Sequence, residues 1–436
     1  MLLTPAMFKY IQGDKYHRLA KREWQFSYQT ITLIAISTLF VLSCLNGAHV
    51  PSTQSSEETP PAMAISSETV QEAPTDFRFG QSEDINSTET FLVAEEMYRN
   101  RHLKHGLAMC MQLLDRDLPS DARDTIHNRL PSYIKNVIGR ATVLRDEKPN
   151  DADWRFSTPS FLTPDRTIIR VVNYYMDLDG SYHVSNDKQV KTKLLVGETE
   201  EWISVTESPA FAAAVAEGNL RYPDVYVTGL EDTRFLVHDE NAPIYTLSSS
   251  SEYTRVSEHI NQVLSILDPT TWTMSIQDII KGPNAEHHEK NWVFADGLQN
   301  IIYDWYPSIQ IGAIDLAASE LVMHTTIESP KSFSSMRGST NGVLHENEWW
   351  FVTHAVFYRP GQLRHYSHRL VVFDKELEST TRYSLPFTFE QDSDVEYCLG
   401  FKADEAGVTF GYSVRDHTSR TLHVAWPEIQ QLFADK

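Results

Sequence analysis

From about residue 154 to the C-terminus, hydrophobic positions come in short runs of β-branched and aromatic residues that polar turns separate. Among these runs are TIIRVVNYYM, TRFLVHD, NIIYDWYPSIQIGAID, EWWFVTHAVFY, RLVVFDK, GVTFGYSV and RTLHVAW. Such composition is typical of strands, and DLDG, HENE and ADEAG are turn signals between them. FAAAVAE near Phe211 is the main helical exception. The pattern predicts a large all-β domain over residues 152–432, with a propeller favoured over a sandwich. No blade-length sequence repeat supports that choice.

Residues 84–148 show a helical pattern instead. Asn86 and Glu89 form a capping box ahead of apolar residues at helical spacing. A break at residues 118–121 offers the N-cap of a second helix, whose apolar positions are Ile126, Leu130, Ile134 and Ile138. We expect an α-helical region packed on the β domain. Its helix-turn-helix form also resembles one tetratricopeptide unit, which cannot bury its own apolar face alone.

The longest apolar run covers residues 30–45, and no charge occurs from Gln25 through Ala48. Basic residues precede the run, namely Lys9, Lys15, Arg18, Lys21 and Arg22, and the first charges after it are acidic. The positive-inside rule therefore predicts a cytoplasmic tail over residues 1–28 and a transmembrane signal-anchor over residues 29–47. The C-terminal domain would then be lumenal, periplasmic or extracellular. A cleaved signal, a form lipidated at Cys44 and a buried core helix are the alternatives.

Residues 48–82 are rich in Ser, Thr, Pro and Glu. Such a segment buries too little apolar surface to offset its ordering entropy, so it predicts a disordered stalk. The three cysteines, Cys44, Cys110 and Cys398, are too far apart to indicate a disulfide framework.

The chain is acidic, with 59 Asp and Glu against 38 Lys and Arg and a formal net charge of −21. A surface of this sign repels phosphate backbones, which argues against a nucleic-acid partner. The sequence also lacks a Gly-rich phosphate loop, a nucleophile elbow and a CxxC pair. His287 and His288 have no further ligands at metal spacing. We therefore expect neither a cofactor nor a metal.

The richest chemistry lies at Glu231-Asp232-Thr233-Arg234, between two predicted strands. A carboxyl group at a strand edge can act as a general acid, and an arginine beside it can orient it. A salt-bridged turn is the alternative if this motif stands alone. Lys290 and Asn291 follow, beside Trp292, and later strands carry Arg337, His354, Tyr366, His368, Glu396 and Asp416.

The order of these motifs resembles the five-bladed β-propeller glycosidases of family 130, the β-mannoside phosphorylases and β-mannosidases. The resemblance covers roughly residues 155 to 430. That family carries a Glu-Asp-Pro-Arg motif, which residues 231–234 match except for threonine at the proline. The resemblance implies that Asp232 is the general acid, that Lys290 lies near a substrate phosphate and that Asp416 binds the sugar. Gly338 to His354 match the family's glycine-rich turn and following strand, with Thr353 in place of a tyrosine.

The sequence also departs from the family. Phosphorolysis in the family uses arginines between the acid and the lysine, and beyond Arg234 this chain has only Arg255 there. We therefore place hydrolysis or glycosyl transfer ahead of phosphorolysis, with Asp394 and Glu396 as candidate bases. A non-catalytic glycan-binding or scaffolding propeller is the alternative. The candidate substrate-binding residues are Glu231, Arg234, Arg170, Lys290, Asn291, Arg337, His354, Tyr366, His368, Glu396 and Asp416.

Overall fold

The computed structural model describes part of the chain, all of it after residue 102. The described residues are 103–134, 138, 142–145, 153–163, 165–184, 189–237, 242–255, 259–284, 288–359, 363–390 and 395–433. The predicted tail, signal-anchor and stalk lie outside them, as does the Asn86 capping box. Within these ranges, no helix has the length and apolarity needed to cross a membrane.

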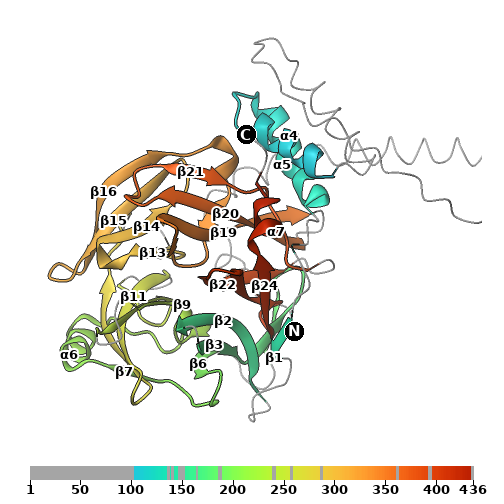
Figure 1. Ribbon diagram of the computed structural model, residues 1–436. Helices are drawn as coiled ribbons and strands as arrows, with labels where there is room; N and C mark the ends of the chain where they lie inside the picture. Colours follow the sequence, from blue (N-terminus) through green and yellow to red (C-terminus); the bar gives the residue numbers. More distant parts are fainter. Residues whose placement is uncertain are drawn as a thin grey trace, which may run out of the picture. The chain divides into compact units, whose positions relative to one another are not determined.

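Five sheets form five blades, which succeed one another around a ring (Figure 1). Blade 1 contains β2 (Arg155–Thr163), β3 (Arg166–Val172), β6 (Val190–Val196) and β8 (Val227–Thr228); blade 2 contains β7 (Ser204–Glu207), β9 (Glu231–Leu236), β10 (Ile244–Ser250), β11 (Asn261–Asp268) and β12 (Thr273–Ile280). Blade 3 contains β13 (Val293–Asp296), β14 (Asn300–Asp304), β15 (Ser308–Asp315) and β16 (Glu320–Glu328). Blade 4 contains β17 (Met336–Gly338), β18 (Val343–His345), β19 (Glu348–Arg359), β20 (Leu363–Asp374) and β21 (Thr380–Tyr383).

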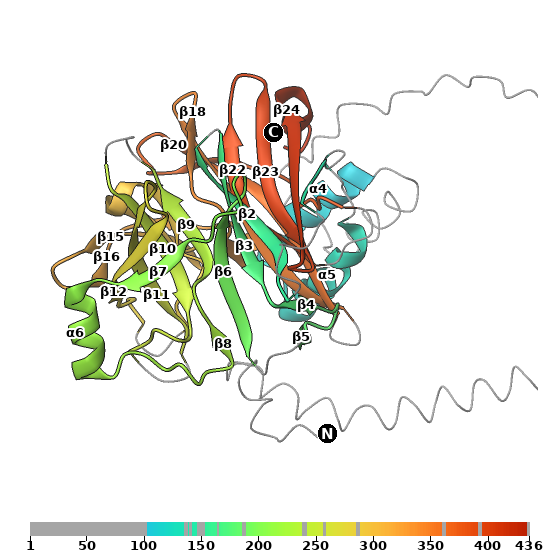
Figure 2. The same ribbon diagram turned by 90° about the horizontal axis from the view of Figure 1, so that it is seen from below.

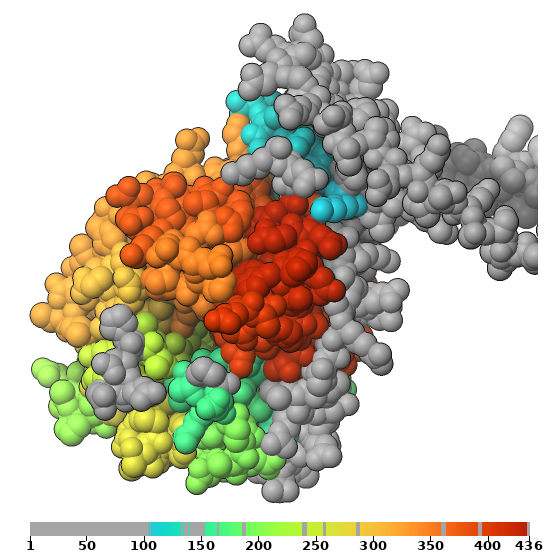
Figure 3. Space-filling model, in the orientation of Figure 1, coloured from blue at the N-terminus to red at the C-terminus, as the bar shows by residue number. Residues whose placement is uncertain are grey.

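Blade 5 contains β22 (Glu396–Ala403), β23 (Gly407–Val414), β24 (Thr418–Ala425) and β1 (Thr142–Arg145). In space-filling form the blades appear as successive coloured sectors in chain order (Figure 3). This arrangement confirms the predicted all-β, five-bladed propeller.

Both faces of a blade are buried, which explains the dense apolar runs in the sequence. Side chains alternate between the faces of a strand. On β19, Trp350 and Val352 belong to the core shared with blade 5, which contains Phe410 and Tyr412. Phe351, between them, belongs to the core shared with blade 3 instead. A strand buried on both faces needs apolar residues at successive positions and not at every second one.

The ring closes through β1, which pairs antiparallel with β24, the last strand of the chain. The sequence pattern predicts an α-helical region over residues 84–148, but Thr142–Arg145 within it form the outer strand of blade 5. A strand from the N-terminal side of the ring thus covers the backbone edge of the last blade, which would otherwise be unpaired.

The helices lie outside the blades. They are α4 (Leu103–Leu114), α5 (Ser120–Tyr133), α6 (Pro209–Gly218), the short α7 (Trp426–Gln430) and the 3-10 turns η2 (Gly297–Gln299) and η3 (Lys331–Phe333). The predicted second helix begins as expected after the break but ends at Tyr133, before Ile138. Helices α4 and α5 contact each other, and they contact η3 and β19 of blade 4. FAAAVAE forms α6, with Ser208 as its N-cap.

Candidate active site

Topology brings residues that are far apart in the sequence to one end of the ring. The first strands of adjacent blades contact each other, as β2 does with both β9 and β22. Because strands alternate in direction within a blade, the starts of the first strands lie at the same end as the turns between second and third strands. Glu231 begins β9, Lys290 and Asn291 precede β13, and Asp416 lies in the turn from β23 to β24.

Two carboxylates share one buried arginine in this group. Nη2 of Arg170 on β3 donates to Oε1 of Glu231 at 2.8 Å, and its Nη1 donates to Oδ1 of Asp232 at 2.9 Å. The Arg170 side chain is 5% exposed, whereas those of Glu231 and Asp232 are 21% and 23% exposed. The arginine therefore lies behind the pair and orients it, while part of each carboxylate faces solvent.

A third carboxylate, that of Asp416, is linked to Arg170 through Tyr174, a residue that was not among the predicted site residues. Tyr174, on the strand β4 (Tyr174–Met176), accepts from Nη2 of Arg170 at 3.1 Å and donates to Oδ2 of Asp416 at 3.1 Å. Burial raises the pKa of Tyr174 well above its ordinary value, so its hydroxyl keeps the proton that it donates. Residues of blades 1, 2 and 5 are thus linked in one hydrogen-bonded group.

Burial also raises the pKa of Glu231, and the neighbouring carboxylates of Asp232 and Asp416 act in the same direction. Arg170 and Lys290 oppose this shift without cancelling it. Glu231 consequently retains a proton to a higher pH than an isolated glutamate does.

Three residues of the group have a left-handed backbone, with φ of 49° at Asp232, 67° at Asn291 and 56° at Asp416. Asp and Asn visit this region more readily than other non-glycine residues, but it still carries strain. Such strain concentrates at functional sites, where the surrounding structure imposes it. At Asp232 one restraint is visible, because Nη1 of Arg234 donates to the Asp232 carbonyl oxygen at 3.0 Å.

Arg234 itself connects three blades. Its Nε donates to the Ser339 carbonyl of blade 4 at 2.9 Å, and its Nη2 donates to the Tyr397 hydroxyl of blade 5 at 3.1 Å. The residue is 1% exposed. Arg234 therefore stabilises the backbone around the site. Because it is buried, we leave it out of the proposed substrate contacts.

Cations interact with the acidic group. Lys290 and Arg337 are solvent-exposed, and neither side chain has a hydrogen-bond or ion-pair partner among the described residues. The pKa of Lys290 is lowered, first because surrounding protein replaces much of its bulk water and next by Arg337; Arg364 adds to this effect. Lys290 still contacts solvent. Glu231 and Asp232 attract it in the opposite sense.

A hairpin of β4 and β5 (Tyr182–Val184) extends from blade 1 to blade 4 at this end of the domain (Figure 2). The amide of Arg364 on β20 donates to the Leu178 carbonyl at 2.8 Å. Gly180, with a φ of 82°, leaves no room for a Cβ beside the Arg364 guanidinium. Burial, followed by Glu231 and Asp416, raises the pKa of Tyr182 above its ordinary value. The hairpin therefore covers one side of the charged group and fixes Arg364 beside it.

Other predicted site residues lie in protein interiors. Glu396 is fully buried, and its oxygens accept from the amides of Phe389 and Glu390 at 2.8 and 2.9 Å. His368 is fully buried beside Phe389, and burial lowers its pKa to about 3. We leave both out of the proposed substrate contacts, because solvent does not reach them.

His354 and Tyr366 stack on each other, one buried and the other half-buried. His354 is buried and its Nδ1 is 2.8 Å from Oγ of Ser339. Its ring stacks on that of the half-buried Tyr366 at 6.0 Å. Burial and the cations Arg337, Arg234 and Lys290 lower the pKa of His354, so the imidazole is neutral at neutral pH.

The remaining candidates lie elsewhere or outside the described residues. Arg255 donates to the Ile279 carbonyl and to Asp278 at the end of β12. Asp394 and His287 lie outside the described residues. Over the described ranges, no three His, Cys, Asp or Glu side chains are grouped as metal ligands.

No protein-family profile matches the chain, and no curated protein does. Among solved structures, it is similar to the β-1,2-mannobiose phosphorylase from Listeria innocua, with 13% identity, 67% of this chain and 96% of that chain covered, and a TM-score of 0.41. A mannose phosphorylase from Leishmania mexicana is 10% identical, with 73% of this chain and 98% of that chain covered and a TM-score of 0.42. A GDP-Man-dependent mannosyltransferase from the same organism is 11% identical, with 67% of this chain and 91% of that chain covered and a TM-score of 0.39.

Proposed function

We propose that this end of the propeller is a carbohydrate-active site for β-mannosides or related glycans, with Asp232 as the general acid. The observation that carries the proposal is the pair of partly exposed carboxylates, Glu231 and Asp232, on one buried arginine. Cleavage or transfer of a glycosyl group needs a proton on the leaving oxygen and a carboxylate that is oriented to deliver it. The motif resemblance assigns that role to Asp232.

The neighbours of Asp232 divide the remaining tasks. Glu231 lies beside the acid, and its raised pKa means that it holds a proton to a higher pH than an isolated glutamate does. Asp416 is held by Tyr174 with part of its surface open, which suits a carboxylate that accepts hydrogen bonds from sugar hydroxyls. In the hydrolytic form of the reaction, a water would attack the anomeric carbon on the face opposite the leaving oxygen as the bond to that oxygen breaks. Asp232 would protonate the leaving oxygen, and a carboxylate base would take the proton of the water.

Phosphorolysis is a second candidate, because blade 4 supplies cations that lie outside the stretch from Asp232 to Lys290. Arg337 and Arg364 both come from blade 4 and lower the pKa of Lys290, so the three cations are close enough to interact. Phosphate and diphosphate groups bind to such clusters of Lys and Arg. The cluster also suits transfer from a sugar nucleotide.

Incubation of the full-length protein with β-mannooligosaccharides separates these possibilities. Release of free mannose in the absence of inorganic phosphate indicates hydrolysis, mannose 1-phosphate formed only with inorganic phosphate indicates phosphorolysis, and elongation that requires GDP-mannose indicates transfer. Glycan binding without turnover under all three conditions would favour the non-catalytic propeller. Absence of both binding and turnover across a panel of β-linked glycans would contradict the proposed substrate class.

Membrane anchoring is a separate proposal, which rests on the apolar run at residues 30–45 and its basic flank. We expect the full-length protein to stay in the membrane pellet after alkaline carbonate extraction, because a spanning helix resists removal. A variant that lacks residues 1–47 is the control and should appear in the supernatant. Release of the intact full-length protein would contradict the anchor.

A further inference from the structure

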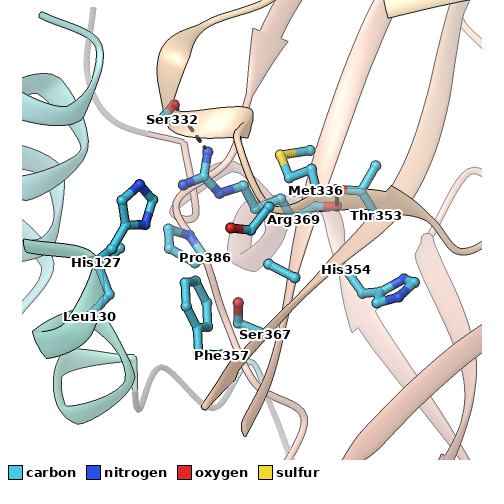
Figure 4. Close-up of a pocket in the computed structure, with 12 residues that line it drawn as sticks. His127, Leu130, Ser332, Met336, Thr353, His354, Phe357, Ser367, Arg369 and Pro386 are labelled. Carbon is cyan, nitrogen blue, oxygen red and sulfur yellow. Dashed lines mark hydrogen bonds between the residues drawn. The ribbon is translucent and has the colours of Figure 1, made fainter. Parts of the chain in front are cut away.

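A small cavity lies between α5 and the strands of blade 4, apart from the charged group described above (Figure 4). Its volume is about 10 Å³, room for one water molecule or an ion of similar size. His127 and Leu130 of α5 line one side, and Thr353, Ser367 and Arg369 of β19 and β20 line the other. Figure 4 shows the ring of His354, another lining residue, turned away from it.

The cavity contains a buried cation without a direct counter-charge. Arg369 is 7% exposed. Its Nη1 donates to Oγ of Ser332 at 3.4 Å, and its Nη2 lies 3.1 Å from Sδ of Met111. Within the described ranges, no carboxylate forms an ion pair with it. Burial lowers the pKa of Arg369 to about 10, so the guanidinium remains charged at neutral pH.

The carboxylate that interacts electrostatically with Arg369 is that of Asp115, and both of its oxygens already accept hydrogen bonds from other groups. Asp115 raises the pKa of Arg369, so the two groups interact at a distance. However, Oδ1 of Asp115 accepts from the Ser332 amide at 2.8 Å, and Oδ2 accepts from the Tyr383 hydroxyl at 2.8 Å. Asp115 therefore docks the loop after α4 onto blade 4 and leaves the positive charge of Arg369 only partly balanced.

The other side chains that line the cavity also favour a negatively charged ligand. Besides Arg369, His127 and His354, the polar side chains around the cavity are the hydroxyls of Ser332, Ser335, Thr353 and Ser367, and no Asp or Glu lines it. Nε2 of His127 is 3.2 Å from Oγ of Ser334. Hydroxyl, imidazole and guanidinium groups can all donate hydrogen bonds to an anion, whereas a metal cation would meet the charge of Arg369 directly.

We infer that this cavity binds one small monoatomic anion, of the size of chloride, which fastens the α4–α5 hairpin to blade 4. The anion would balance a guanidinium that is otherwise buried at a substantial cost, and it would accept hydrogen bonds from both α5 and β20. A water molecule fits the same space but leaves the charge unbalanced. This inference does not depend on the proposed function, because His354 is the one lining residue that is also a candidate substrate contact, and its ring is turned away from the cavity.

Two measurements on the full-length protein test the site. Crystals soaked in bromide should show an anomalous peak beside Arg369. In solution, sodium chloride should raise the melting temperature by about 3 °C over sodium gluconate at equal ionic strength, because the ligand binds only the folded state. The Arg369→Met variant should lose this difference, whereas Arg116→Met, at an exposed arginine between α4 and α5, should keep it.

The result that overturns the inference is equally direct. No bromide peak, together with equal melting temperatures in chloride and gluconate, would show that the cavity holds only water. If Arg369→Met fails to fold, Arg369→Lys keeps the charge but not the fork of donors and should show a reduced chloride effect. A chloride effect of unchanged size in Arg369→Lys and Arg369→Met would place the anion elsewhere.

Discussion

Replacing Asp232 by asparagine should lower turnover of the glycan substrate by about 10²- to 10⁴-fold, the usual range for loss of a general acid. The amide keeps the shape of the carboxyl group and can still accept from Arg170, so the fold should persist. Binding of an unreactive glycan should change much less than turnover, because the proton is needed only as the leaving oxygen departs. Rate measurements beside calorimetric binding would separate the two effects.

Two control variants make the Asp232 result specific. Asp224→Asn is the same change at an exposed position, where no side-chain hydrogen bond to the described residues is present, and it should retain full activity. Glu231→Gln keeps the general acid but removes its neighbour's charge, so it should shift the pH dependence of turnover and reduce the rate less. If Glu231→Gln abolishes turnover while Asp232→Asn does not, the acid is Glu231 and the proposed assignment is wrong.

The fold followed from the sequence because its signal is local. Runs such as EWWFVTHAVFY carry β-branched and aromatic residues at successive positions, and blades buried on both faces need them. Ring closure was not predictable in the same way. Thr142–Arg145 lie directly after a helical pattern, and only their pairing with β24, nearly three hundred residues later, makes them a strand.

The candidate site residues differ in burial, and their sequence context did not distinguish them for a physical reason. A sequence shows which residues are polar but not which face they take, so buried Arg234, His368 and Glu396 looked the same as the partly exposed Asp232 and the exposed Lys290. Phosphate-binding cations were sought between residues 232 and 290, whereas Arg337 and Arg364 reach Lys290 from blade 4. Tyr174 and Arg364 depend on a hairpin that crosses between blades, which no local pattern signals.

Glu289, the residue before Lys290, should make the protein less stable as the pH rises from about 4.5 to 7. It is 5% exposed, and burial raises its pKa from 4.5 to about 7. Below 4.5 the folded and unfolded chains both hold the proton; above 7 both have lost it, and the folded chain then contains a buried charge. Between these values the unfolded chain binds fewer protons, so this group lowers the free energy of unfolding by about 3 kcal/mol in total.

Glu289→Gln tests this directly, because an amide mimics the protonated acid. The carboxyl oxygens lie 3.2 Å from Nε1 of Trp292 and 3.4 Å from the Tyr303 hydroxyl, and a glutamine can satisfy both groups without a charge. Denaturant unfolding at pH 4.5 and pH 7.5 should give the variant a growing advantage over the unaltered protein. Glu376→Gln, at an exposed glutamate, should follow the unaltered protein at both pH values. An equal pH dependence in all three proteins would mean that Glu289 has the same pKa in the folded and unfolded chains, and that its hydrogen bonds offset the effect of burial.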